Sequence, residues 1–420
     1  MLEPRVRHGQ RFAGPFLRHF LQAEEGGSRA LDAAKPLLLA LALLAVALAA
    51  LNGLARSLGD SPQFSFTLAG SFAIYLATRP ARREVVVTVL LGLALRLAYE
   101  VMVGVPPYFG SILICFAGFL GVAGLMALAF RALRDKRYLA FGTAAFFPFV
   151  SILVGFVLVA LRRLSPTTLD AHLLAADGTL GFQPSFVLGS VLLGRKSLWD
   201  LASTVYYALP FAIALLCAAQ FEKNFNEVRR LLSLFIAMSV AGLALYAVCP
   251  ATGPIYAFRD CYPFRPPHLT YREIGAALFV PLAPRNAMPS VHFGTALLVF
   301  WNTADLRKAG RIAAGLFLAG MAFAVLALGE HYLIDLIVAV PFCLVFQAAY
   351  TNSNPVNSRA RYRAIWGSAA LVAGWILMLR FCIGTVIAWP AVTCTAFVAT
   401  LGFSIWARRE LSLAGPVAGI

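Results

Sequence analysis

The sequences RNAMPSVHFGTALLVF at residues 285–300 and LGEHYLIDL at residues 328–336 place two histidines at the starts of two apolar segments. His292 opens the first segment and His331 opens the second, and Asp335 follows His331 by four residues. On a helix this spacing puts Asp335 and His331 on one face, where a carboxylate orients an imidazole. Ionisable groups at the edge of a membrane span are costly unless they are paired or functional. The two stretches therefore predict helices that carry a candidate site in their first turns.

The composition of the chain indicates a polytopic membrane protein. Of its 420 residues 60% are hydrophobic and 13% are charged, and the mean hydropathy is +0.78. A soluble globular protein carries far more charge than this. Apolar runs near the ~20 residues that cross a bilayer recur along the whole sequence. We therefore predict an all-α, polytopic transmembrane helical bundle.

The apolar runs predict about 12 spans, separated by short polar loops. A polar, basic segment at residues 1–35 precedes them, and a mixed segment at 162–197 is expected to form interfacial helices or a re-entrant piece. The predicted spans cover residues 36–56, 63–78, 85–104, 108–130, 138–161, 198–220, 231–249, a run beginning at 289, 311–328, about 331–350, 365–386 and 389–406.

The net charge of +16 follows the membrane topology. Basic residues fall in short clusters between apolar runs, with neither a long basic tract nor an aromatic-studded groove, so a nucleic-acid partner is not expected. With the N-terminus in the cytoplasm, alternating spans place both histidines at the outer membrane face. The clusters that then lie inside are 79–83, 131–137, 223–230, 307–311, 359–363 and 408–409.

Two loops that this topology places outside, 162–197 and 250–286, contain arginines, the side chain that best binds phosphate. Arg285 lies closest to the predicted site, and Arg272 and Arg259 are more distant candidates. Ser290 and the amides at the start of the helix that begins near residue 289 are further candidates, because helix N-termini favour anions.

This set of side chains suits phosphoryl transfer. A phosphate ester requires a nucleophile, an acid for the leaving oxygen and positive charge around the phosphoryl oxygens. His331 is the candidate nucleophile with Asp335 as its orienting partner, and His292 is the candidate general acid and base. No metal-ligand cluster is evident in the sequence, so we expect neither a metal nor another cofactor, and positive charge from arginine.

Other residues near the site leave alternatives open. Glu330 is read either as a ligand for an acceptor hydroxyl or as an exposed interfacial carboxylate. Tyr246, Tyr256 and Tyr332 either line the site or anchor the chain at the interface. Cys249 and Cys261 border one polar loop, and they form a disulfide or remain free thiols.

The motifs resemble those of a known family. PSVH at 289–292 and HYLID at 331–335 are similar to the second and third signatures of the phosphatidic acid phosphatase type 2 superfamily. Within it the chain most resembles the inositol phosphorylceramide synthase-like branch, on CPATGPIYAF at 249–258, LLAADGTLGF at 173–182 and the HYxxD form of the last motif. The resemblance implies a metal-independent phosphohistidine mechanism with His331 as nucleophile.

The resemblance covers about residues 138–350, which it implies to be a six-helix catalytic core. Accessory helices at 36–137 and C-terminal helices at 351–420 lie outside it. Phosphatases of the superfamily usually carry Ser-Arg six to seven residues before the nucleophile, where this chain has Ala324 and Val325. Their first signature, a lysine followed by Arg-Pro, is not evident, and the loss fits the transferase branch better.

We therefore expect an integral membrane phosphotransferase that moves a phospho-headgroup from a lipid donor to an alcohol acceptor, of inositol or sphingolipid type. The alternatives are a lipid phosphate or polyprenyl diphosphate phosphatase, and a non-catalytic transporter or scaffold. The expected partners are the membrane and a lipid phosphate or phospholipid substrate, and the sequence does not determine the oligomeric state. The expected location is a bacterial inner membrane, with both termini cytoplasmic and the site on the periplasmic face.

Overall fold

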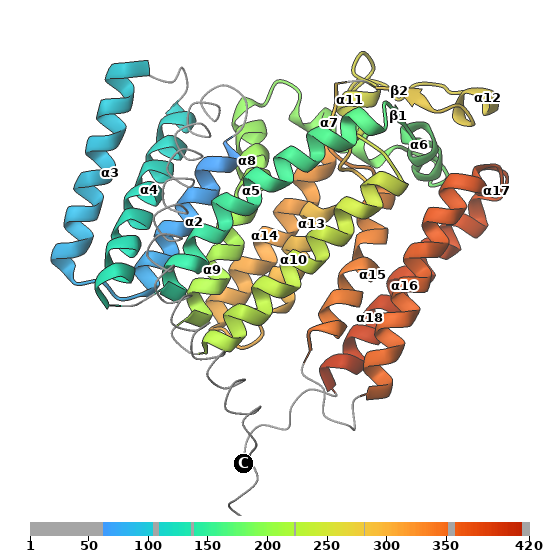
Figure 1. The fold of residues 1–420 in the computed structure, drawn as a ribbon. Coiled ribbons are helices and arrows are strands. Elements are labelled where there is room, and N and C mark those ends of the chain that lie inside the picture. The colour runs from blue at the N-terminus through green and yellow to red at the C-terminus, as the bar shows by residue number, and fades with distance from the viewer. Residues whose placement is uncertain are drawn as a thin grey trace, which may run out of the picture.

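The computed structural model describes residues 62–103, 109–135, 138–221, 224–280, 282–351 and 358–413. The predicted basic N-terminus and the first predicted span lie outside these residues. The described chain is almost entirely helical (Figure 1), as predicted. Its longer helices are α2 (Gln63–Ala77), α3 (Arg82–Val103), α4 (Phe109–Asp135), α5 (Tyr138–Leu164), α8 (Lys196–Tyr207), α9 (Leu209–Phe221), α10 (Phe225–Val248), α13 (Val291–Trp301), α14 (Lys308–Ala327), α15 (Leu333–Ala349), α16 (Ser358–Phe381) and α18 (Pro390–Leu413).

Six of the described helices are long and apolar enough to cross a membrane, and a seventh span is possible if α8 and α9, bent by 51°, count as one. Helices α2, α13 and α15 are apolar but shorter than 18 residues. Every predicted span from residue 63 onward coincides with a helix or, at 198–220, with the bent pair. The protein is thus an integral membrane helical protein, whereas the count of about 12 spans stays a prediction.

Helix α2 is the centre of an N-terminal group of helices. It packs against α4, α5 and α9, and so joins this group to the rest of the bundle. Gly121 of α4 lies so close to α2 that an added Cβ would stand 2.0 Å from the Leu68 carbonyl oxygen. Small residues permit such backbone contact, which is a common basis for helix association in membranes.

The central helices α13, α14 and α15 also pack closely at small residues. Gly294 of α13 faces α15, where an added Cβ would stand 2.6 Å from the Cys343 sulfur. Helix α13 also packs on α14, and α16 and α18 cover the other side of α15. Met238 and Val338 are among the fully buried residues of this core.

The two polar segments fold over one end of the bundle, at the top of Figure 1. The first forms β1 (Thr167–Thr168), α6 (Asp170–Gly178) and α7 (Pro184–Leu192), and the second forms α11 (Pro254–Ala257), α12 (Tyr271–Ile274) and β2 (Leu278–Phe279). Strands β1 and β2 pair antiparallel, with Thr167 opposite Phe279. The short helix α17 (Ile383–Ala388) packs against α6 from the C-terminal side.

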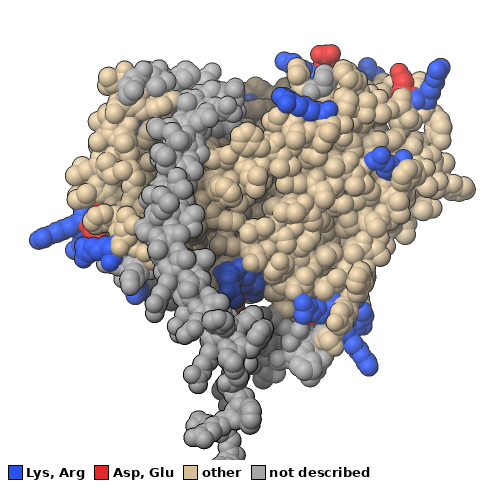
Figure 2. Space-filling model, viewed as in Figure 1, with Lys and Arg blue, Asp and Glu red and all other residues tan. Residues whose placement is uncertain are grey.

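Charged side chains gather toward the two ends of the molecule, and Figure 2 shows an uncharged surface between them. Such a belt is what a bilayer core requires. All seven cysteines are free, so Cys249 and Cys261 form no disulfide in this structure.

Candidate active site

The first side of the site is the N-terminus of α13. The Ser290 hydroxyl oxygen accepts a hydrogen bond from the Phe293 amide at 3.3 Å, which caps the helix and places His292 in its first turn. The Ser290 amide donates to the backbone carbonyl of Asp335 at 3.2 Å. The starts of α13 and α15 are therefore joined, and PSVH lies beside HYLID.

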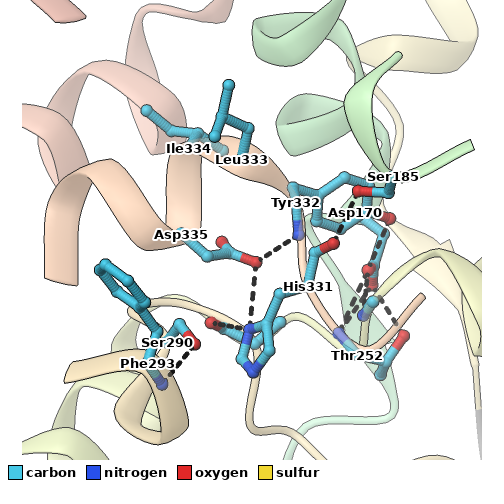
Figure 3. A network of polar contacts seen from close by, with 12 residues as sticks. Asp170, Ser185, Thr252, Ser290, Phe293, His331, Tyr332, Leu333, Ile334 and Asp335 are labelled. Atoms are coloured by element: carbon cyan, nitrogen blue, oxygen red, sulfur yellow. Dashed lines mark hydrogen bonds and ion pairs between the residues drawn. The ribbon is translucent and has the colours of Figure 1, made fainter. Parts of the chain in front are cut away.

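The second side is the N-terminus of α15, which begins at Leu333. The sequence predicts His331 and Asp335 on one helix, but His331 precedes the helix because Asp335 caps it. Its Oδ2 accepts the Tyr332 amide at 2.8 Å and lies 3.4 Å from His331 Nδ1 (Figure 3). The structure thus brings the carboxylate and the imidazole together through a cap instead of a helix face.

The tautomer of His331 follows from its partners. Nδ1 lies 2.9 Å from the Ala287 carbonyl oxygen, which can only accept, so Nδ1 carries the proton and donates it. Nε2 then holds the lone pair, is buried and has no hydrogen-bond partner. Burial lowers the pKa of His331 to about 3, which keeps the imidazole neutral. A neutral imidazole with a free Nε2 is the form that attacks phosphorus.

His292 lies beside His331. The two imidazole centroids are 6.3 Å apart, with the rings inclined at 57°. His292 also stacks on Tyr206 of α8, with centroids 4.2 Å apart and planes at 15°, and its Nδ1 has no partner. The two rings are close enough to act on one phosphoryl group, with a fixed orientation for each.

The backbone of residues 329–331 is fixed by the end of α14. The amides of Glu330 and His331 both donate to the Val325 carbonyl at 3.1 Å. Gly329 completes the turn with φ of 74°, and an added Cβ there would stand 2.6 Å from the Tyr262 ring. Val325 itself is fully buried.

Helix α6 holds residues 329–332, the histidine loop, through side chains for which the sequence predicts no role. The Asp170 carboxylate accepts hydrogen bonds from the Thr252 and Gly253 amides, the Thr252 hydroxyl and the Tyr332 hydroxyl, at 2.9 to 3.1 Å. Burial raises the pKa of Asp170, while these donors lower it. The only signal in the sequence was the acidic pair of DAHLLAAD within a segment too apolar for a free loop.

Asp177 and Ser185 complete this support. Asp177 accepts the Leu333 amide at 2.7 Å and the Ile334 amide at 2.9 Å, and so occupies the free amides of α15. The Ser185 hydroxyl donates to the His331 carbonyl at 2.8 Å. Figure 3 shows the contact of Ser185 with His331 and those of Asp170 with Thr252.

The four side chains predicted to bind phosphate are either buried in other hydrogen bonds or exposed at the surface. Arg285 is fully buried, and its guanidinium donates to four carbonyl oxygens, those of Ser165, Pro166, Val280 and Ala283, at 2.6 to 3.1 Å. Ser290 is also fully buried and is engaged as the helix cap. Arg259 and Arg272 are exposed and do not line the cavity that contains His292.

A cavity of about 370 Å³ opens on the site. Its polar end is lined by His292, Asn286, Glu330, Tyr246 and Tyr256. The Tyr256 hydroxyl donates to Glu330 at 3.0 Å, and the side-chain amide oxygen Oδ1 of Asn286 has no partner. Among the described residues that line this cavity, none is lysine or arginine.

The third tyrosine, Tyr332, is fully buried and serves the scaffold through Asp170. Within the described ranges no group of three or more His, Cys, Asp or Glu side chains is arranged to hold a metal ion.

Replacing Arg285 by Lys is expected to lower the thermal unfolding midpoint in detergent and to leave the KM for a lipid phosphate unchanged. A lysine ammonium cannot reproduce the planar guanidinium that donates to four carbonyl oxygens. The substitution therefore leaves buried acceptors unsatisfied, at a cost of about 1–3 kcal/mol each. Arg259→Lys, at an exposed position, is the control and should change neither quantity. A higher KM with an unchanged midpoint would show instead that Arg285 binds the phosphate.

Comparisons with known proteins bear on this geometry. No curated protein and no solved structure matches the chain in these comparisons. A family model matches the segment from α6 to the end of α15, which contains His292, His331 and Asp335. Residues 171–349 match the model of the PAP2 superfamily, whose members are generally phosphatases or phosphotransferases.

Proposed function

We propose that this protein is a membrane phosphotransferase that moves a phospho-headgroup from a lipid donor to an alcohol acceptor through a phosphohistidine. The observation that carries the proposal is the buried, unpartnered Nε2 of His331, whose Nδ1 is held by the Ala287 carbonyl and Asp335, with the His292 ring 6.3 Å from the His331 ring. A scaffold would gain nothing from a buried lone pair without a partner at the centre of such a network.

The first step forms a bond between His331 Nε2 and phosphorus and breaks the bond from phosphorus to the leaving oxygen. Protonated His292 gives its proton to that oxygen. Asp335 stabilises the imidazolium that develops on His331. In the second step an acceptor hydroxyl gives its proton to His292, its oxygen bonds to phosphorus, and the bond from nitrogen to phosphorus breaks.

The site is proposed to face the periplasm of a bacterial inner membrane. Support comes from the arrangement of the helices, because α10, α14 and α16 begin next to basic clusters at the end of the bundle opposite to the site (Figure 1). The positive-inside rule assigns that basic end to the cytoplasm.

Transfer to an alcohol is favoured over hydrolysis by the polar end of the cavity. Glu330 and Tyr256 present a carboxylate and a phenol beside His292, and these groups bind hydroxyls. The absence of lysine and arginine from the described lining does not favour a free phosphate dianion, which carries more charge than a phosphodiester. The inositol phosphorylceramide synthase-like branch fits this preference.

The test is a product analysis with purified protein, labelled lipid phosphates and phospholipids, and acceptor alcohols that include inositol. A new phosphodiester lipid whose amount increases with acceptor concentration is the expected result. Release of phosphate to water alone, at every acceptor concentration, would replace the transferase by a lipid phosphate or diphosphate phosphatase. No turnover of any phosphate would favour the transporter or scaffold.

The ratio of transfer to hydrolysis is expected to rise with pH from about pH 6 to about pH 8 and to lose this dependence in Glu330→Gln. Burial raises the pKa of Glu330 to about 7, while hydrogen bonds from Tyr256 and Tyr206 lower it. Below that pH the carboxyl is protonated, and above it the ionised carboxylate accepts the hydroxyl of the acceptor and orients it.

The measurement is the yield of phosphodiester against phosphate across this pH range, with Asp260→Asn as the control at an exposed position. A pH dependence in Glu330→Gln identical to that of the wild type would show that Glu330 does not orient the acceptor.

A further inference from the structure

The cavity that reaches His292 is lined in part by helices that precede the family-matched segment. Helix α5 contributes Phe147, Val150, Val154 and Leu158, which follow one another at three or four residues and so share a face. Helix α2 contributes Gln63 and Thr67. One wall of the cavity therefore lies outside the family-matched segment, and the other residues of the lining lie within it.

The cavity is elongated along the bundle. Its lining runs on α5 from Phe146 to Leu158, a distance of about 18 Å along a helix. On α10 it runs from Phe235 to Tyr246, about 16 Å. Tyr246 lies at the site end of α10, so the polar groups are at one end and the far end is aromatic and aliphatic.

Helix α5 leaves room for a ligand on this side. It packs mainly against α2 and α4 and makes few contacts with α9 and α10. In Figure 1 it crosses obliquely in front of these helices. The seam between α5 and α10 thus contains the cavity, and Phe149 and Phe156 on other faces of α5 point to the surrounding apolar surface.

We propose that this cavity holds one hydrocarbon tail of the phosphate-bearing donor lipid, with α2 and α5 as part of its wall. The site presupposes the phosphotransfer function proposed above. A long channel that is mostly apolar away from Glu330 and His292 favours burial of methylene groups. The donor is the occupant because phosphorus must lie between His292 and His331 Nε2, and the donor is the molecule bonded to that phosphorus in the first step.

Two glycines of α5 provide a matched pair of variants. Gly155 lines the cavity, Gly142 does not, and a Cβ added at either meets no atom within 4 Å. Phenylalanine is therefore expected to be accommodated at both positions, but only Gly155→Phe reduces the length of the cavity. The assay compares kcat/KM for donors with one headgroup and either short or long acyl chains.

Gly155→Phe is expected to keep the wild-type rate with the short-chain donor and to lose about tenfold or more with the long-chain donor. A tenfold loss corresponds to about two methylenes left unburied. Gly142→Phe is expected to match the wild type with both donors. Ser239→Phe, on the α10 wall, serves as a second variant and should reproduce the chain-length dependence.

Equal losses with short and long donors in both Gly155→Phe and Ser239→Phe would overturn the tail site, as would the same chain-length loss in Gly142→Phe. A loss that depends on the acceptor chain, measured with lipid and soluble acceptors in turn, would assign the cavity to the acceptor instead. His331→Ala distinguishes a failure of the tail site from a failure of the proposed phosphotransfer. If it is inactive while Gly155→Phe and Ser239→Phe equal the wild type, phosphotransfer stands and the tail site fails; if it is active, phosphotransfer itself fails.

Discussion

His331→Ala is expected to lower phosphotransfer by about 10⁴-fold or more, because it removes the atom that bonds to phosphorus. Each of the two histidines has one unpartnered imidazole nitrogen, Nδ1 of His292 and Nε2 of His331. Asp335 orients only His331, so no other described residue offers an equivalent nitrogen at this position. The measurement combines turnover with trapping of the intermediate. Donor labelled in the phosphoryl group should leave an acid-labile, base-stable label on the wild-type protein.

The controls separate the two histidines. His331→Ala should carry no label, whereas His292→Ala should lose turnover through the acid and base steps while keeping the nucleophile. His268→Ala, at an exposed histidine, should equal the wild type in both assays. Label that persists in His331→Ala at the wild-type level would place the nucleophile elsewhere.

The helices and the proximity of His292, His331 and Asp335 could be predicted from sequence because both signals are local. Apolar length predicts a helix wherever a span crosses a bilayer, and the described helices follow the predicted runs from residue 63 onward. Charge clusters between those runs placed His292 and His331 at one face, and in the structure their rings lie 6.3 Å apart.

The predictions about phosphate ligands depended on proximity in sequence, which does not report how a side chain is satisfied. Arg285 lies seven residues before His292, yet its guanidinium points to carbonyls at 165 and 166, which belong to a distant segment. Likewise, the spacing of His331 and Asp335 suggested a shared helix. The helix instead begins at Leu333, two residues after His331, because Asp335 caps it through the Tyr332 amide. Such pairings exist only once α6 and the outer loop have packed together.

Asp170→Ala is expected to destabilise the protein by about 3–5 kcal/mol and to lower the activity of the folded fraction. Asp170 is fully buried and lies 162 residues from Tyr332, whose hydroxyl donates to it at 2.9 Å. Alanine would leave that hydroxyl and the amides of Thr252 and Gly253 without an acceptor. Because Tyr332 adjoins His331, the loss of this anchor should lower kcat more than it raises KM.

The measurement is the thermal unfolding midpoint in detergent, together with kcat and KM. Asp170→Asn should fall between alanine and the wild type, because its one carbonyl oxygen accepts part of the network while its amide group faces donors. Asp200→Ala is the control, since Asp200 is exposed and pairs with Lys196 at 2.9 Å, an interaction that contributes about 0–1 kcal/mol. A midpoint for Asp170→Ala equal to that of Asp200→Ala would mean that α6 does not hold the histidine loop. In that case the orientation of His331 would depend on the Val325 carbonyl, the Ala287 carbonyl, Ser185 and Asp335.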